Sequence, residues 1–252
     1  MRRYTGAVDP ARIVYSLAPP QDMALLAAAA GGYHALLGAE ADQAGRYRHA
    51  ADAAAFLASR ALLRLLAADL LGVPAHRAAG IQVRRYCRTC GGTGHGKPQV
   101  AGLEVSMSRT RTLVLAAAGP EGVRLGADVE VVPDAVFEGF DDTVLSPAER
   151  SRCAGSGALE RMRLWTAKEA ALKATGHGLA VEPALLSVEP AAAAAADPFT
   201  ARMNCPDEPE LDGLHLAWVP AGGRHLAAVA CSQMLPVAPV PPRRAAGMAG
   251  SG

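Results

Sequence analysis

A long helical segment followed by several short strand-like segments occurs twice along the chain, and this order restricts the fold most. The first helix is predicted over Asp42 to Leu71, an alanine- and leucine-rich stretch that Gly72-Val73-Pro74 ends. Apolar runs bounded by glycine, proline and polar residues follow and predict strands at 80–86, 103–107, 113–118 and 123–132. Helices and strands in this order favour an α+β fold.

The second set begins with a short helix from Pro147 to Cys153, for which Ser146 is a suitable N-cap. A stronger helix is predicted from Leu159 to Thr175, with Gly176 and Gly178 after it as a stop signal. Strands are expected near 185–188, 215–219 and 226–231, and a loop or an insertion over 191–209. We therefore predict two related α+β halves, 1–122 and 123–235, joined near Pro120 to Gly122, with 236–252 as a flexible tail.

Charge and apolar content limit the class of protein. The formal net charge is +1, which argues against a surface built to grip nucleic acid, so any phosphate binding must be local. The alanine runs are too short for a membrane span, and Arg2 and Arg3 are not followed by the apolar core of a secretory signal. Five cysteines, an odd number, fit a reducing compartment better than a disulfide framework. We expect a monomeric, cytoplasmic protein of enzyme size.

Cys87, Cys90 and His95 could supply three zinc ligands. No second Cys-x-x-Cys or His pair follows at finger-like spacing to complete a tetrahedral site, so the sequence does not favour structural zinc. A zinc-dependent nucleic-acid module built on these residues is a further hypothesis, and the near-neutral charge disfavours it as well.

Lysine is rare here, with three among the 25 basic Lys and Arg residues. Lys97 lies in a Gly-Lys-Pro turn, and Lys168 and Lys173 lie on the second long helix. Because an ammonium is more compact than a guanidinium, these positions are the first place to look for chemistry. Arg60 and Arg64 share one face of the first helix, where an anion between them would relieve their repulsion; two solvated surface arginines are the alternative.

Three carboxylates predict a metal site. Asp128 and Glu130 are two residues apart at the end of an apolar strand and can point to one side, and Glu169 shares a helix face with Trp165 and Lys173. Mg²⁺ prefers oxygen ligands and keeps positions for water and phosphate oxygens. The alternatives are a solvated strand end and an ordinary Glu-Lys helix pair in front of a tryptophan.

These motifs, in this order, carry a resemblance to a known family. Gly126-Ala127-Asp128-Val129-Glu130, followed by Trp165-Thr166-Ala167-Lys168-Glu169-Ala170-Ala171-Leu172-Lys173, resembles the paired signature of the Sfp-type 4′-phosphopantetheinyl transferases. Upstream, Gly96-Lys97-Pro98 and the arginine in Ser59-Arg60-Ala61 are also similar to family motifs, so the resemblance spans roughly 46–188.

The resemblance implies two α+β halves related by a pseudo-twofold axis, with coenzyme A as substrate in the cleft between them. It implies that Asp128, Glu130 and Glu169 hold Mg²⁺ and that Lys173 contacts a phosphate. The reaction would transfer the phosphopantetheine arm to a serine of an acyl or peptidyl carrier protein, with Glu169 or a metal-bound water beside it as candidate base. The resemblance also implies that Arg60, Lys97 and Pro98 bind the 3′-phosphate end of coenzyme A and that Lys168 lies near the phosphates. Glu149 would assist the metal site or the base.

The chain departs from the family pattern at Ser106-Met107-Ser108, where family members commonly carry a histidine between two serines. A thioether cannot donate a charge-assisted hydrogen bond to a phosphate. Ser106, Ser108, Arg109 or Arg111 are the candidates to replace that contact. The departure leaves open a second class of function, a non-catalytic module that binds coenzyme A or carrier proteins.

Overall fold

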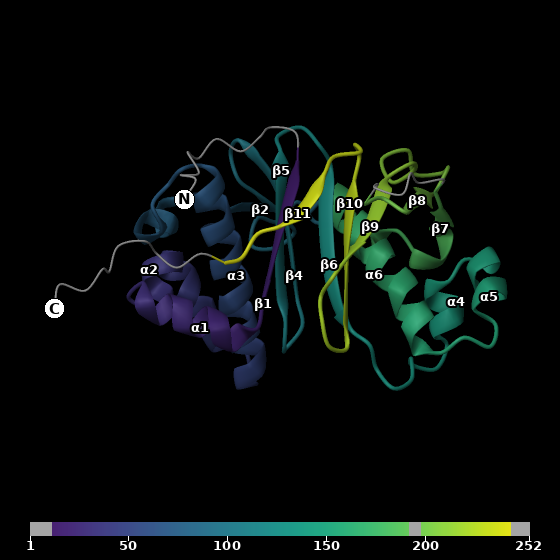
Figure 1. Ribbon diagram of the computed structural model, residues 1–252, viewed down its shortest axis with the longest axis horizontal. Helices are drawn as coiled ribbons and strands as arrows, with labels where there is room; N and C mark the ends of the chain where they lie inside the picture. Colours follow the sequence, from purple (N-terminus) through teal and green to yellow (C-terminus); the bar gives the residue numbers. More distant parts are fainter. Residues whose placement is uncertain (1–11, 192–197, 243–252) are drawn as a thin grey trace.

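The computed structural model describes residues 12–191 and 198–242, and it consists of helices on both sides of two central sheets (Figure 1). Helices α1, α2 and α3 cover the outer face of the first sheet. Helix α6 covers the outer face of the second sheet, and α4 and α5 lie beyond it. This arrangement confirms the α+β prediction.

The first sheet has the strand order β11-β1-β5-β4. All of its pairs are antiparallel except β1 with β11, which is parallel. The hairpin of β2 and β3 stands apart as a two-stranded sheet. The elements up to the end of the first sheet are β1 (Ile13–Ala18), α1 (Pro20–Ala29), α2 (Tyr33–Leu37), η1 (Gly38–Arg46), α3 (Ala50–Leu70), η2 (Ala75–Gly80), β2 (Arg84–Tyr86), β3 (Lys97–Gln99), β4 (Leu103–Arg109) and β5 (Val114–Pro120).

The second sheet is antiparallel, with the order β6-β10-β9-β8-β7. Its first strand follows β5 directly, so the chain passes from one sheet to the other at 121–124. The remaining elements are β6 (Leu125–Val131), α4 (Phe140–Val144), α5 (Pro147–Cys153), α6 (Ala158–Thr175), η3 (Gly178–Ala180), η4 (Pro183–Leu185), β7 (Ser187–Pro190), β8 (Ala201–Asn204), β9 (His215–Val219), β10 (His225–Cys231) and β11 (Val237–Pro239).

Strand alternation divides the apolar side chains among three layers of core. In β1, Val14 packs toward the helices, whereas Ile13 and Tyr15 pack between the sheets. In β6, Ala127 and Val129 enter the same inter-sheet core. The residues between them point the other way, toward α6, which is how Asp128 and Glu130 come to face that helix. The two halves therefore share one buried apolar interface.

Several predicted elements agree closely with the structure. The helix over Pro147–Cys153 begins with a capping box in which Ser146 and Glu149 bond each other's backbone N–H, and α6 ends at Gly176 with φ of 75°. The first long helix is shorter than predicted, because residues 42–46 belong to the 3-10 helix η1 and α3 begins only at Ala50. Strand β1 and helix α1 were not predicted. The division into two related halves, 1–122 and 123–235, stays a prediction.

Two segments differ from their predictions. Val237–Pro239, within the segment expected to be a flexible tail, forms β11 and pairs with Ile13–Tyr15 of β1. Ala201–Asn204, within the expected loop, forms β8. Residues 243–252 and 192–197 lie outside the described residues.

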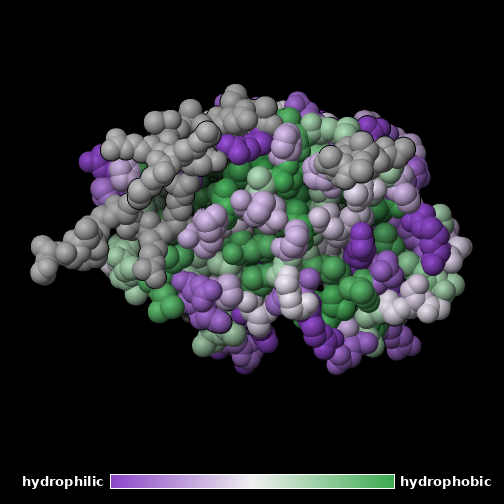
Figure 2. Space-filling view, in the orientation of Figure 1, coloured by the Kyte–Doolittle hydropathy of each residue, from purple (hydrophilic) through white to green (hydrophobic). Residues whose placement is uncertain are grey.

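In the part of the chain that the structure describes, no helix combines the length and apolar content that crossing a bilayer needs. Figure 2 shows hydrophobic and hydrophilic groups interspersed over the face in view, with hydrophilic groups gathered along its lower edge.

Candidate active site

A glycine on β6 allows α6 to approach the strand closely enough to form a site. A Cβ built at Gly126 would lie 1.9 Å from the carbonyl oxygen of Ala170 and 2.3 Å from the backbone nitrogen of Ala174. Both atoms belong to the helix backbone, so no side chain is tolerated here without moving α6. This contact sets the helix face that carries Glu169 and Lys173 against the strand that carries Asp128.

The acidic side chains and Lys173 meet between β6, α6 and the neighbouring strand β4. Lys173 forms an ion pair with Asp128, which is 1% exposed, and donates to the hydroxyl of Ser108 at 2.8 Å. Ser108 in turn donates to Asp128 Oδ1 at 2.7 Å. The indole of Trp165 donates to Glu130 Oε1 at 3.1 Å. Trp165 and Lys173 thus face β6 together, as the helical spacing predicts.

Burial and mutual repulsion perturb these carboxyl groups. Burial, with Asp128 as the next largest cause, raises the pKa of Glu130 to about 7. The pKa of Glu169 is raised by burial and by Asp128, against the opposing effect of Lys173. Burial acts to lower the pKa of Lys173, but the three carboxylates outweigh it and hold that pKa above its ordinary value. The crevice therefore holds more negative charge than one ammonium neutralises.

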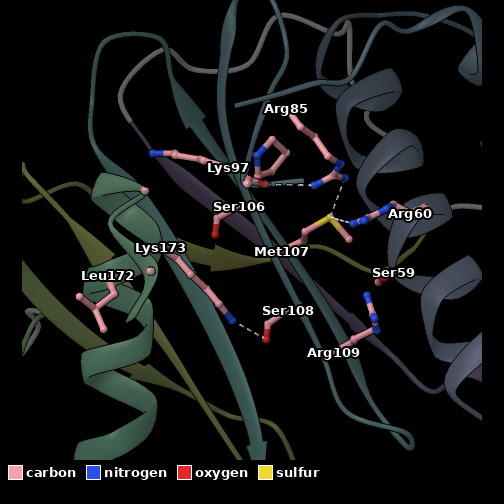
Figure 3. Close-up of a pocket in the computed structure, with 14 residues that line it drawn as sticks. Ser59, Arg60, Arg85, Lys97, Ser106, Met107, Ser108, Arg109, Leu172 and Lys173 are labelled. Atoms are coloured by element: carbon pink, nitrogen blue, oxygen red, sulfur yellow. Dashed lines mark hydrogen bonds between the residues drawn. The ribbon is translucent and has the colours of Figure 1, made fainter. Parts of the chain in front are cut away.

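The opposite wall of the crevice is basic. Arg60 of α3 and Arg85 of β2 both donate toward Met107 Sδ, at 3.0 and 3.6 Å (Figure 3). Burial and the neighbouring Arg85 lower the pKa of Arg60 to about 10, which leaves it cationic at neutral pH. Burial also lowers the pKa of Arg85. A soft sulfur thus occupies the acceptor position between two guanidinium groups, where an anionic oxygen would be a stronger partner.

The anion that the sequence places between Arg60 and Arg64 is a carboxylate of the chain itself. Glu40 lies 3.1 Å from Arg60 Nε, pairs with Arg64, and is 4.0 Å from Arg85. Arg64 is 7% exposed, so the alternative of two solvated arginines is wrong. One carboxylate facing three guanidinium groups leaves this wall with a net positive charge.

A cavity of about 440 Å³ lies between the basic wall and the side of the site that carries Lys173 and Ser108. Figure 3 shows Arg60, Arg85 and Met107 on one side of it and Lys173 with Ser108 on the other. Its lining comes from α3, β2, β3, β4 and α6 together: Ser59, Arg60, Arg85, Gly96, Lys97, Pro98, Ser106, Met107, Ser108, Arg109, Leu172, Lys173, Gly176 and Gly178.

The Gly96-Lys97-Pro98 turn lies in this lining, but the ammonium of Lys97 is already engaged. It forms an ion pair with Glu104 and donates to the carbonyl oxygen of Ala174 near the end of α6. Figure 3 shows its side chain extending away from Arg85 and Met107. The turn therefore brings backbone and Pro98 to the cavity while Lys97 joins it to α6.

The side chains that could replace the missing histidine differ in whether they line the cavity and in which partners they already bond. Ser106 lines the cavity, but its hydroxyl accepts from the backbone N–H of Ala127 at 2.9 Å and so joins β4 to β6. Arg109 lines the cavity beside Tyr47, to whose hydroxyl it donates at 3.0 Å. Arg111 is exposed and pairs with Asp52 at 2.7 Å, outside the cavity lining.

Glu149 and Lys168 do not join the other predicted site residues. Both side chains are 0% exposed, and they form an ion pair with each other. Glu149 also accepts from the backbone N–H groups of Ser146 and Val188, each at 2.8 Å. Because their hydrogen-bonding groups are used inside the protein, the structure gives them a structural place between α5 and α6. This corrects the expectation that they act on phosphate, metal or proton.

Sequence reasoning missed Glu40 and Arg85. Arg85 lies between Arg84 and Tyr86 in a predicted strand, where successive side chains point to opposite faces. Arg84 and Tyr86 are exposed and Arg85 is half-buried, so this alternation was the available signal. Glu40 carries no local signal. It lies in η1, which tertiary packing places beside the arginines of α3.

The carboxylate set offers the oxygen donors that Mg²⁺ prefers, and one feature of the structure fits a cation there. Asp128 Oδ2 is buried without a hydrogen-bond partner. An unpaired buried carboxylate oxygen is costly unless a cation or donor compensates it. The oxygens of Asp128, Glu130 and Glu169 do not form a group within 4.8 Å of one another, so their convergence on one ion would need side-chain rotation.

A comparison with known protein families matches the part of the chain that carries the acidic residues. Residues 124–219 match the family model of the 4′-phosphopantetheinyl transferase superfamily. The matched segment begins just before β6, includes all of α6, and so contains the three carboxylates and Lys173. The mixed α+β architecture is consistent with the fold of that superfamily. A search of curated proteins found no match.

Proposed function

We propose that the protein transfers the 4′-phosphopantetheine arm of coenzyme A to a serine of an acyl or peptidyl carrier protein, in the presence of Mg²⁺, and releases adenosine 3′,5′-bisphosphate. The observation that carries the proposal is the meeting of a basic wall and an acidic wall in one crevice. Arg60 and Arg85 line the cavity on the basic side. On the other side Lys173 and Ser108 line it, and both bond Asp128 behind them, next to Glu130 and Glu169. The superfamily match over 124–219 supports it independently.

The basic wall suits the phosphate at the nucleotide end of coenzyme A. The guanidinium groups of Arg60 and Arg85 converge on Met107 Sδ, and a phosphate oxygen is a stronger acceptor than that thioether. Phosphate binding would therefore displace the sulfur from its two donors. Lys97 keeps the turn in place, since Glu104 and Ala174 already hold its ammonium.

The acidic wall suits the pyrophosphate. Mg²⁺, when bound there by Asp128, Glu130 and Glu169, would neutralise charge on the pyrophosphate oxygens. Lys173 donates to Asp128 and Ser108, and an ammonium has three N–H bonds, so one more can reach a phosphate oxygen. Its raised pKa keeps it charged through neutral pH.

In the transfer, the carrier serine oxygen bonds to the phosphorus that bears the pantetheine arm. The bond from that phosphorus to the bridging oxygen breaks, and this oxygen leaves with the adenosine bisphosphate. The serine proton needs an acceptor. We assign it to the carboxylate of Glu169, whose raised pKa makes it a stronger base than an exposed glutamate.

Mass spectrometry tests the proposal directly. Purified protein, coenzyme A and Mg²⁺ are incubated with an apo carrier protein, and a gain of the phosphopantetheine mass on the carrier is expected. Glu169→Gln removes the carboxylate with little change of shape and should abolish the gain. The matched control is Glu160→Gln on the exposed side of the same helix, which should leave transfer unchanged. Transfer retained in Glu169→Gln would contradict the assignment of that residue.

A non-catalytic module that binds coenzyme A is the second candidate, and Met107 is the observation that favours it. The same experiment separates the two, because binding of coenzyme A by calorimetry without transfer to any of several carriers would support the module. We further propose that the protein acts in the cytoplasm as a monomer, where carrier proteins and coenzyme A are available.

A further inference from the structure

The loop between β2 and β3 gathers three metal-binding side chains that the proposed transfer does not use. Cys87 opens the loop, Cys90 follows one turn later, and His95 closes it. Their ligand atoms all lie within 4.8 Å of one another, and Cys90 Sγ is 3.3 Å from His95 Nε2. With the usual Zn–S and Zn–N bond lengths, neighbouring ligands of a tetrahedral zinc lie about 3.6–3.8 Å apart. The cluster is therefore already close to the size of such a site.

The backbone of the loop is folded around these side chains. Cys87 N–H donates to the carbonyl oxygen of Gly92 at 2.9 Å, and Gly91 N–H donates to that of Cys87 at 2.8 Å. Gly92 N–H donates to Cys90 Sγ at 3.4 Å, so the backbone of the loop also holds one of the two sulfur atoms in place.

The two glycines are needed for this geometry. Gly91 has φ of 69°, the left-handed region that side chains disfavour. A Cβ on Gly92 would lie 3.1 Å from Cys90 Sγ and 3.5 Å from His95 Nε2. A side chain at position 92 would therefore crowd two of the three ligand atoms.

We propose that Cys87, Cys90 and His95 bind one Zn²⁺ ion, with the fourth position taken by water. Two thiolates and an imidazole select zinc over Mg²⁺, which prefers oxygen. The sequence disfavours zinc because it offers no fourth side-chain ligand. A zinc site with three protein ligands and one water needs no fourth side chain. Binding releases the thiol protons to solvent.

The ion would fix the loop that leads into the cavity wall. Gly96 follows His95 directly, and a Cβ there would lie 2.2 Å from the carbonyl oxygen of Tyr86, so the neck of the loop is tightly closed. Within the loop, Arg88 pairs with Glu210 and donates to the carbonyl oxygen of Thr175 at 3.2 Å. The exposed loop has little apolar surface to bury, and a metal would supply the order that packing does not.

Metal analysis of the full chain, purified without a histidine tag after growth with added zinc, tests the proposal. One zinc per chain is expected. Cys87→Ser and His95→Ala should each lose most of it, whereas Cys153→Ser, at a buried cysteine of α5, should retain it. Co²⁺ exchanged into the wild type should give intense visible bands with thiolate-to-metal absorption in the near ultraviolet.

Several outcomes would overturn the proposal. These are a reduced protein that neither contains zinc nor gives cobalt bands, a zinc content unchanged in His95→Ala, or a Cys87–Cys90 disulfide in protein purified under reducing conditions. Circular dichroism of each variant excludes general unfolding as the cause of metal loss. Glu169→Gln should keep its zinc, which separates failure at this loop from failure of the proposed transferase site.

Discussion

Lys168→Met tests whether the buried ion pair holds the fold or serves the chemistry. The Lys168 ammonium is 0% exposed and uses all three of its N–H bonds, to Glu149 Oε2 at 2.5 Å, the carbonyl oxygen of Val144 at 2.6 Å and that of Pro183 at 3.0 Å. Methionine matches the unbranched stem of lysine and lacks the charge. The substitution therefore removes the ammonium and leaves three acceptors behind.

The expected loss of stability follows from that geometry. Breaking a buried ion pair by removing one partner costs about 3–5 kcal/mol, because the remaining charge is left uncompensated. Glu149 keeps its bonds from the backbone N–H groups of Ser146 and Val188, which favours the lower part of this range. For a chain of this size each kcal/mol lowers the melting temperature by about 2–4 °C, so a fall of about 6–16 °C is expected.

Thermal and urea unfolding followed by circular dichroism measure the loss, and calorimetry at low temperature measures coenzyme A binding by the folded protein. Binding should be close to wild type, since neither residue lines the cavity. Arg163→Met, at an exposed cation of the same helix, is the control and should cost less than about 1 kcal/mol. A Lys168→Met protein of wild-type stability that binds coenzyme A poorly would refute the structural assignment.

Three further outcomes follow from the site. Gly126→Ala places a Cβ 1.9 Å from the carbonyl oxygen of Ala170, so the free energy of unfolding, measured by chemical denaturation, should fall by at least about 3 kcal/mol. A fall of less than about 1 kcal/mol would contradict the close packing of β6 and α6. Arg85→Ala should weaken coenzyme A binding roughly 10- to 100-fold by calorimetry, whereas exposed Arg84→Ala should change it little; equal effects would count against the basic wall. With EDTA present, the raised pKa of Glu130 predicts a stabilising contribution to folding that is complete below about pH 4.5 and is lost as the pH rises through about 7. Glu130→Gln should therefore make the melting temperature depend less on pH over this range. A pH profile of the melting temperature identical to that of the wild type would contradict the prediction.

The parts of the fold that the sequence predicts well carry their own local signals. Ser146 as N-cap predicts the start of α5, and Gly176 predicts the end of α6. The structure adds the reciprocal bond of Glu149 that completes a capping box. The spacing of Trp165, Glu169 and Lys173 likewise predicts the face that α6 turns to β6. Each of these depends on residues within a few positions of one another, and the structure confirms them.

The parts that the sequence does not predict depend on distant contacts. Strand β11 forms because Val237–Pro239 finds the free edge of β1 near the other end of the chain, and its proline-rich composition resembles a tail. Glu40 reaches Arg60 and Arg64 through tertiary packing, so no spacing rule connects them. The ion pair of Glu149 with Lys168 joins side chains from two different helices, so no local pattern predicts it.

Lysine and arginine occupy different kinds of position in this protein because their charged groups differ in shape. Each lysine binds a carboxylate and at least one further oxygen in a confined space: Glu104 for Lys97, Glu149 for Lys168 and Asp128 for Lys173. A compact ammonium with three N–H bonds fits among such convergent oxygens, whereas a planar guanidinium does not. All three contacts fasten α6 to its surroundings. The scarcity of lysine therefore marks the helix that supports the site, and of the three lysines Lys97 and Lys173 line the cavity whereas Lys168 is buried away from it.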